Sequence, residues 1–222
     1  SASSLYSIIT IKNKNRMNHL IIIAHPREDS LNYDIKNKIQ KYANTAGDKV
    51  KVRDLYKMKF NPVLDYHELK YLKEGHVCPD ILVEQSYISW ADELTFIYPL
   101  WWNAFPALLK GYIDRVFTHG FAFKVTESGV KGLLKGKRVR LITSAGMDKQ
   151  FLTKMNILES LKITQDKGVF EFCGMEVIDH AYITESTQLS YKQKEDAINN
   201  ILKKVGPHRK QKTYPMSNGS SY

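Results

Sequence analysis

The residues of this chain that could do chemistry gather in three short segments. The first reads His25-Pro26-Arg27-Glu28-Asp29-Ser30-Leu31-Asn32 and leads into a helical pattern. The first turn of a helix has unpaired backbone N–H groups and a partial positive charge, so it favours an anion such as a phosphate. Ser30 and Asn32 add a hydroxyl and an amide, and His25 and Arg27 add positive charge. The alternative interpretation is an ordinary helix cap with a structural histidine.

The second segment, Tyr98 to Pro106, contains two of the three tryptophans of the chain, Trp101 and Trp102. Burial alone does not require two indoles in a connecting loop. Aromatic walls combined with free backbone N–H groups suit a flat heterocycle with polar edges. The alternative is that both rings fill a gap beside a sheet.

The third segment, Thr143-Ser144-Ala145-Gly146, has small side chains that expose its backbone. Such a loop can approach the edge of a ring closely and donate hydrogen bonds to it. Many turns have a similar composition, so this segment is informative mainly beside the other two.

Short apolar runs alternate with helical patterns between these segments. The run Leu20–Ala24 is wholly apolar, as expected of a parallel strand that is covered on both faces. Further strands are expected at 49–53, 94–98, 139–143 and from residue 175, and helices at 30–46, 81–90, from 106, 161–172 and 190–205. This alternation predicts an α/β fold, a doubly wound, five-stranded parallel sheet with helices on both faces. In such sheets ligands bind at the carboxyl ends of the strands, where all three segments fall.

Composition excludes several other classes of protein. The 222 residues include two cysteines, Cys78 and Cys173, too few for a disulfide framework, so a reducing, cytoplasmic location is expected. His76 lies near Cys78, but no further ligands surround them, and no metal site is expected. Because no run approaches the roughly 18 apolar residues of a membrane span, no membrane insertion is expected.

The net charge of +10 lies mostly near the two ends of the chain. Residues 1–16 and 206–222 contain no acidic residue and carry six of the ten net charges. We therefore expect 1–16 to be an extension outside the fold, natural or introduced, 17–205 to be one folded domain, and 206–222 to be a flexible basic tail. The domain itself has no strong basic bias, so no nucleic-acid partner is expected.

The three segments, with several others, resemble the flavodoxin-like NAD(P)H:quinone oxidoreductases. This group includes mammalian quinone reductases, bacterial modulators of drug activity and ancillary subunits of potassium-efflux systems. The resemblance covers about residues 17–205, and its most specific part runs from Tyr98 through the Trp-Trp pair to Gly120-Phe121-Ala122. Phe172-Cys173-Gly174 matches as well.

The resemblance implies a flavin cofactor, NAD(P)H as co-substrate and a homodimer with each active site at the interface. It assigns the flavin phosphate and ribityl chain to His25, Ser30, Leu31 and Asn32. It assigns the isoalloxazine ring to Pro99, Leu100, Trp101, Trp102 and Asn103 on one side, and to Thr143, Ser144, Ala145 and Gly146 on the other. The implied reaction is ping-pong: hydride passes from nicotinamide to flavin N5 and then to a quinone, azo or nitro compound. No side chain is certain to be catalytic, and the Gly146 backbone is the candidate that stabilises charge at flavin N1 and O2.

This sequence departs from the family at the substrate pocket. Phe151 stands where the mammalian enzymes have a relay tyrosine, and Asn156 or Ile157 where they have a relay histidine. Phe123 and Val125 replace tyrosines that contact the acceptor, so Phe123, Val125 and Phe151 are the predicted pocket residues. The connection 62–73 is shorter than in FAD-binding members, which favours FMN while leaving FAD open.

Two other functions remain open from the sequence. One is an accessory subunit of a membrane transporter, in which redox activity is secondary. The other is a flavodoxin-like electron carrier without NAD(P)H turnover. Such carriers are usually acidic, whereas this domain is mildly basic.

Overall fold

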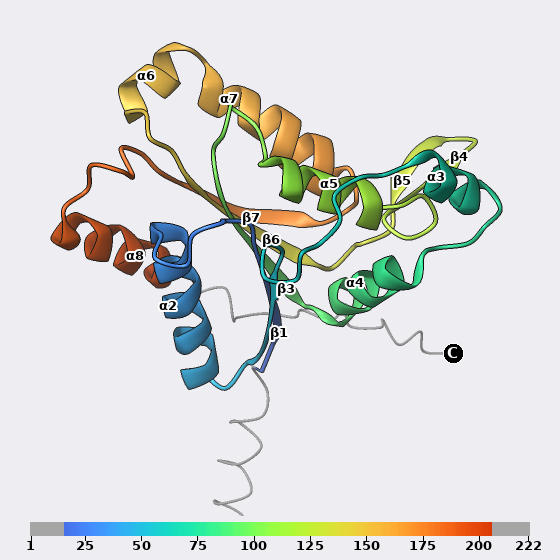
Figure 1. Ribbon diagram of the computed structural model, residues 1–222, viewed down its shortest axis with the longest axis horizontal. Helices are drawn as coiled ribbons and strands as arrows, with labels where there is room; N and C mark the ends of the chain where they lie inside the picture. Colours follow the sequence, from blue (N-terminus) through green and yellow to red (C-terminus); the bar gives the residue numbers. More distant parts are fainter. Residues whose placement is uncertain (1–15, 206–222) are drawn as a thin grey trace, which may run out of the picture.

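The computed structural model describes residues 16–205 of the chain (Figure 1). The expected basic tail and all of the expected N-terminal extension except Arg16 lie outside the described residues. The five strands of the main sheet are β1 (Asn18–Ile23), β2 (Lys49–Asp54), β3 (Glu93–Pro99), β6 (Arg138–Ser144) and β7 (Glu176–Ile183).

All five strands are parallel, in the order β2-β1-β3-β6-β7. The expected five-stranded, doubly wound sheet is therefore confirmed. The chain runs outward from β1 to β2 and then crosses back over β1 to β3. We use the term crevice for the region outside the carboxyl ends of β1 and β3, because proteins with such sheets bind ligands where the strand order reverses.

Helices cover both faces of the sheet (Figure 1). One face packs against α2 and α8 through a cluster that includes Ile21, Ile35 and Ile198. The other face packs against α4, α5 and a π-helix, η1, through a cluster that includes Phe96, Tyr112 and Phe170. The helices are α2 (Leu31–Thr45), α3 (Tyr66–Lys73), α4 (Pro79–Trp90), α5 (Ala107–Val116), α6 (Lys149–Lys154), α7 (Ile157–Leu161), η1 (Lys162–Glu171) and α8 (Tyr191–Val205).

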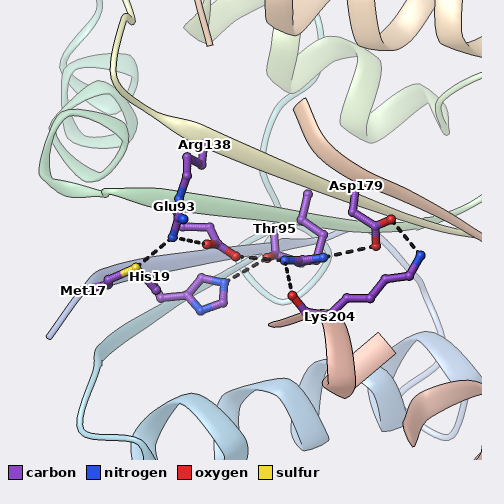
Figure 2. A network of polar contacts seen from close by, with 8 residues as sticks. Met17, His19, Glu93, Thr95, Arg138, Asp179 and Lys204 are labelled. Carbon is purple, nitrogen blue, oxygen red and sulfur yellow. Dashed lines mark hydrogen bonds and ion pairs between the residues drawn. The ribbon is translucent and has the colours of Figure 1, made fainter. Parts of the chain in front are cut away.

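Charged side chains are buried inside this sheet, toward the amino ends of its strands (Figure 2). Arg140 is fully buried on β6, with its guanidinium 3.1 Å from a carboxylate oxygen of Asp179 and 3.6 Å from one of Glu93. Arg138 pairs with the same Glu93 at 2.8 Å. Each buried charge thus faces an opposite charge, which is the condition for keeping it ionised away from water.

Four features were not anticipated from the sequence. Helices α3 and α6 lie within stretches expected to be connections, and each begins at an aspartate, Asp65 or Asp148, whose side chain caps it. The strands β4 (Phe123–Thr126) and β5 (Gly129–Gly132) form a small antiparallel hairpin. The segment expected to be one helix from 161 begins at the end of α7 and continues as the π-helix η1.

Within residues 16–205, no helix is long and apolar enough to cross a membrane.

Candidate active site

The three segments come together at the carboxyl ends of β1, β3 and β6. The rings of His25 and Trp101 lie 6.3 Å apart, which places the first segment beside the second. The backbone N–H of Leu100 donates to the carbonyl oxygen of Ser144 over 2.7 Å, which joins the second segment to the third. The candidate site is therefore the crevice where the order of the strands reverses.

The first segment ends in a capped helix with an unpartnered amide. Ser30 is extended (φ −88°, ψ 157°), and its hydroxyl accepts a hydrogen bond from the Tyr33 backbone N–H, so it is the N-cap of α2. Asn32 is buried, yet neither its Nδ2 nor its Oδ1 has a hydrogen-bond partner among the described residues. A buried amide without partners costs about 1–3 kcal/mol. It fits a ligand whose polar groups complete its hydrogen bonds.

His25 and Arg27 are held close to the start of α2. The Nδ1 of His25 lies 3.1 Å from the backbone nitrogen and from the carbonyl oxygen of Arg27. Partial burial lowers the pKa of His25, although the Arg27 carbonyl acts in the opposite direction. Arg27 is exposed and paired with Asp29 at 2.9 Å, so its charge is already partly balanced.

The second segment presents its two indole rings to the outside. Trp102 and Asn103 both have left-handed backbone angles, with φ of 51° and 55°. Trp102 is fully exposed and Trp101 nearly half exposed, whereas Leu100 is buried beneath them. The two indoles therefore do not fill a gap beside the sheet, and that alternative interpretation is wrong.

The third segment has fewer accessible backbone groups than its small side chains indicated. Thr143 and Ala145 are buried, and the Ala145 N–H donates to the carbonyl oxygen of Ile183 over 2.8 Å. At Gly146, a β-carbon would meet no atom within 4 Å, so there is open space beside the chain. The segment can therefore meet a ring edge at Gly146 rather than through Ala145 or the Thr143 side chain.

The predicted pocket residues lie in two separate places. Phe151 is on α6, and the following residue, Leu152, packs against Leu100 and Ala145, so α6 borders the crevice. Phe123 and Val125 belong to the hairpin β4–β5, which lies on the other side of the molecule from the start of α2 and from α6 (Figure 1). Within one chain, the hairpin does not join the crevice.

A polar cluster near the crevice was not predicted from the sequence. Asp166, His180 and Tyr182 come together from η1 and β7, with Asp166 Oδ1 2.7 Å and the Tyr182 hydroxyl 2.9 Å from Nδ1 of His180. The rings of His180 and Tyr182 stack at 4.1 Å. Two polar rings at positions 180 and 182 share one face of a strand, and this spacing is the signal that could have pointed to the pair.

In residues 16–205, no three His, Cys, Asp or Glu side chains gather in a way that could hold a metal ion. The crevice offers a helix start that suits an anion, exposed indole rings and an open backbone edge at Gly146. A flat, phosphorylated ring system matches these three features.

The strand order is that of flavodoxin-like proteins, and the profile of a family with the flavodoxin-like fold matches residues 17–207. A protein of Haemophilus influenzae described as an NAD(P)H oxidoreductase is 41% identical over 73% of this chain and 81% of its own length. NAD(P)H dehydrogenase (quinone) 1 of Cavia porcellus is 36% identical over 72% of this chain and 66% of its own length. The solved structure of an NAD(P)H:quinone oxidoreductase from Methanothermobacter marburgensis superposes with a TM-score of 0.76 at 26% identity, over 85% of this chain and 96% of that one. This chain belongs to the flavodoxin-like NAD(P)H:quinone oxidoreductase family and is an oxidoreductase.

Proposed function

We propose that this protein uses a bound flavin, preferentially FMN, to transfer two electrons from NAD(P)H to a quinone or a similar acceptor by a ping-pong mechanism. The observation that carries the proposal is the buried, unpartnered amide of Asn32 beside the capped start of α2. The names of relatives of this chain, which include an NAD(P)H oxidoreductase and an NAD(P)H dehydrogenase (quinone), support the same reaction.

The flavin would be held from both ends. The N–H groups of the first turn of α2 and the Ser30 hydroxyl would bind its phosphate, and Asn32 its ribityl chain. Pro99, Leu100 and the two indoles would frame one side of the ring, and the Gly146 backbone its other edge. The open space at Gly146 allows this close approach.

When bound, flavin supplies the hydride chemistry itself, accepting from nicotinamide and giving to the acceptor. The protein has to orient the ring, exclude water from one face and place donors where negative charge develops. The Gly146 N–H fits this last role, because a backbone donor carries no side chain that could titrate. The exposed Trp102 would cover one wall of the pocket in which nicotinamide and acceptor bind in turn.

A homodimer would complete this pocket. Large apolar side chains are exposed around the crevice, and such patches mark interaction sites. These side chains are Trp101, Trp102, Met147, Phe151 and Met155. In a dimer, Phe123 and Val125 of the second copy could reach the crevice that the hairpin of the same chain does not.

An absorbance spectrum of the purified protein, followed by anaerobic addition of NADPH or NADH, tests the proposal. We expect flavin bands that bleach at once and return when menadione is added. Chromatography of the released cofactor distinguishes FMN from FAD. A protein that stays colourless after soaking with both flavins would refute the proposal.

The same experiment distinguishes the enzyme from an electron carrier. A carrier would bind flavin but would not be bleached by either nicotinamide nucleotide. Rapid bleaching therefore favours the enzyme over this alternative, and the more effective of NADPH and NADH identifies the preferred donor.

A further inference from the structure

A ring of hydrogen-bonded polar side chains lies directly beneath the crevice. His180 is held between two groups, with Nδ1 2.7 Å from Oδ1 of Asp166 and Nε2 3.0 Å from Oγ1 of Thr143. The Thr143 hydroxyl also hydrogen-bonds that of Tyr98. The Tyr98 hydroxyl donates to Oε1 of Gln165 over 2.6 Å. The series of contacts thus runs from Asp166 to Gln165, which are adjacent residues of η1, and so closes into a ring.

The π-helical winding of η1 directs both of these residues inward. Gln165 and Asp166 are adjacent, yet both are buried against the sheet. A π-helix is rare and is frequently found at functional sites. Its wider turn allows two neighbouring side chains to reach the same ring.

This ring links the segments assigned to the flavin ring to a pocket beside β7. Tyr98 and Thr143 are paired across β3 and β6; Tyr98 immediately precedes one of these segments, and Thr143 begins the other. At the other end of the ring, His180 and Tyr182 line a pocket of about 470 Å³ between β7, α6 and α8. The His180 side chain is 4% exposed, so we expect a proton to reach it from this pocket.

The reaction itself consumes one proton that the hydride does not bring. A quinone gains two electrons and two protons, whereas the hydride from nicotinamide brings two electrons and one proton, so one proton per turnover must come from solvent or protein. Phe151 and Asn156, at the positions of the family's proton relay, have no group that titrates in the required range.

We propose that His180, oriented by Asp166, takes up a proton from the pocket as the site gains negative charge and returns it to the pocket when the acceptor removes that charge; the proton that the acceptor itself needs comes from solvent. This inference rests on the proposed flavin-dependent function. His180 is a positioning residue, because it acts on the crevice through Thr143. With Nδ1–H donating to Asp166, a neutral imidazole accepts the one hydroxyl hydrogen of Thr143 at Nε2, whereas an imidazolium donates from Nε2 to the Thr143 oxygen and leaves that hydrogen for the Tyr98 oxygen.

The charged and titratable groups around His180 come from five elements. The Asp166 carboxylate on η1 lies 2.7 Å from Nδ1 of His180, and Lys149 on α6 and Lys204 on α8 line the same pocket as His180. Burial raises the pKa of Tyr98 on β3 and of Tyr182 on β7, which holds both phenols neutral. Histidine is the side chain that ordinarily changes charge between about pH 5 and 8.

The direct test counts the protons taken up when the flavin-loaded protein is reduced anaerobically with one equivalent of NADPH in weakly buffered solution. We expect the wild type to take up as much as one proton more per site than His180→Gln, in a bell-shaped dependence on pH. Asp166→Asn removes the carboxylate charge and should move this bell to lower pH.

A second readout needs no flavin and no turnover. The ¹⁵N NMR signals of the His180 ring in the flavin-free protein report its titration, and Asp166→Asn should lower the midpoint. This measurement still tests the orientation by Asp166 if His180→Gln folds poorly.

His19 provides a matched control at the other end of the sheet. Its Nε2 lies 2.8 Å from Oγ1 of Thr95, and it is buried on a strand like His180 (Figure 2). His19→Gln should leave proton uptake unchanged.

Two results would overturn the inference in different ways. Equal proton uptake by the wild type and His180→Gln at every pH, with both proteins bleached normally, would refute the role of His180 alone. If the wild type binds no flavin, the proposed function fails and this inference fails with it.

Discussion

The guanidinium of Arg140 joins the interior of the sheet to the last turn of α8, because its Nη2 donates a hydrogen bond to the carbonyl oxygen of Lys204 over 3.1 Å. The same side chain faces the carboxylates of Glu93 and Asp179. A single buried cation thus balances carboxylates on two strands, β3 and β7, and donates to an otherwise unpaired carbonyl oxygen at the end of a helix.

Replacing this cation should leave the two carboxylates with one cation each, Arg138 beside Glu93 and Lys204 beside Asp179, and should leave the Lys204 carbonyl without its donor. Arg140→Met is expected to lower the free energy of unfolding by about 3–5 kcal/mol, as measured by urea denaturation. The double variant Arg140→Met/Asp179→Leu should recover part of this loss. A single variant as stable as the wild type would show that the ion pairs contribute little.

Asn32→Leu should separate stability from binding. Leucine has a similar size and removes two unpartnered polar atoms, so the flavin-free protein should become more stable by about 1–3 kcal/mol. Flavin affinity should fall about 10-fold or more, as measured by quenching of flavin fluorescence. Asn37→Leu, at an exposed position of the same helix, is the control and should leave flavin affinity unchanged. Unchanged affinity in Asn32→Leu would remove this residue from the site.

Trp102→Ala should act on association rather than on folding. The indole is fully exposed in one chain, so its loss should change the free energy of unfolding by no more than about 0.5 kcal/mol. If it lies in a dimer interface, dimer dissociation should rise about 30-fold or more, as measured by sedimentation. Tyr191→Ala removes another exposed aromatic ring, at the start of α8, and should leave the dimer intact.

Gly111→Ala should destabilise the protein although alanine favours helices. A β-carbon at this position of α5 would lie 2.2 Å from the carbonyl oxygen of Pro62, which is backbone and cannot easily move. We expect a net loss of about 1–3 kcal/mol in thermal or urea unfolding. At the neighbouring Lys110, which forms only an exposed pair with Asp114, alanine should change stability by less than about 0.5 kcal/mol. A stabilised Gly111→Ala would mean that the Pro62 segment is free to retreat.

The two cysteines should differ sharply toward alkylating reagents. Burial raises the pKa of the Cys173 thiol to about 11, so at pH 8 only roughly one molecule in a thousand carries the reactive thiolate. Its alkylation rate should therefore keep rising with pH up to about 11. Cys78 is less buried and should react first. In Cys78→Ser the fast phase should vanish, and its persistence would contradict this assignment.

The main sheet could be predicted because short stretches of sequence already mark its strands and the helices between them. The apolar run from Leu20 to Ala24 needs burial on both faces, and Pro106 marks the start of the helix that follows the aromatic loop. The hairpin β4–β5 escaped prediction because each strand has four residues and most of them are exposed. Helix α3 was missed because Glu68 is the one residue buried along it, paired with Arg115 from α5.

The candidate site was predicted by residue type and corrected by backbone geometry. Three loops were expected to bind one ligand, and they do meet at one crevice. The sequence could not reveal that Thr143 points into the core, because its partner His180 is 37 residues away. Nor could it show that the Ala145 N–H donates a hydrogen bond to the carbonyl oxygen of Ile183 on β7. Such pairings depend on the tertiary fold rather than on local pattern.

The winding of η1 makes the length of this segment as important as its composition. A π-helix accommodates one more residue per hydrogen-bonded turn than an α-helix does. Deleting one residue between Lys162 and Gln165 would allow the segment to rewind as an α-helix, which would rotate Gln165 and Asp166 relative to the sheet. Tyr98 and His180 would then lose their partners together, although none of the four side chains had been substituted. Among relatives of this chain, an insertion or a deletion here would therefore change the polar ring as thoroughly as a mutation of His180 itself.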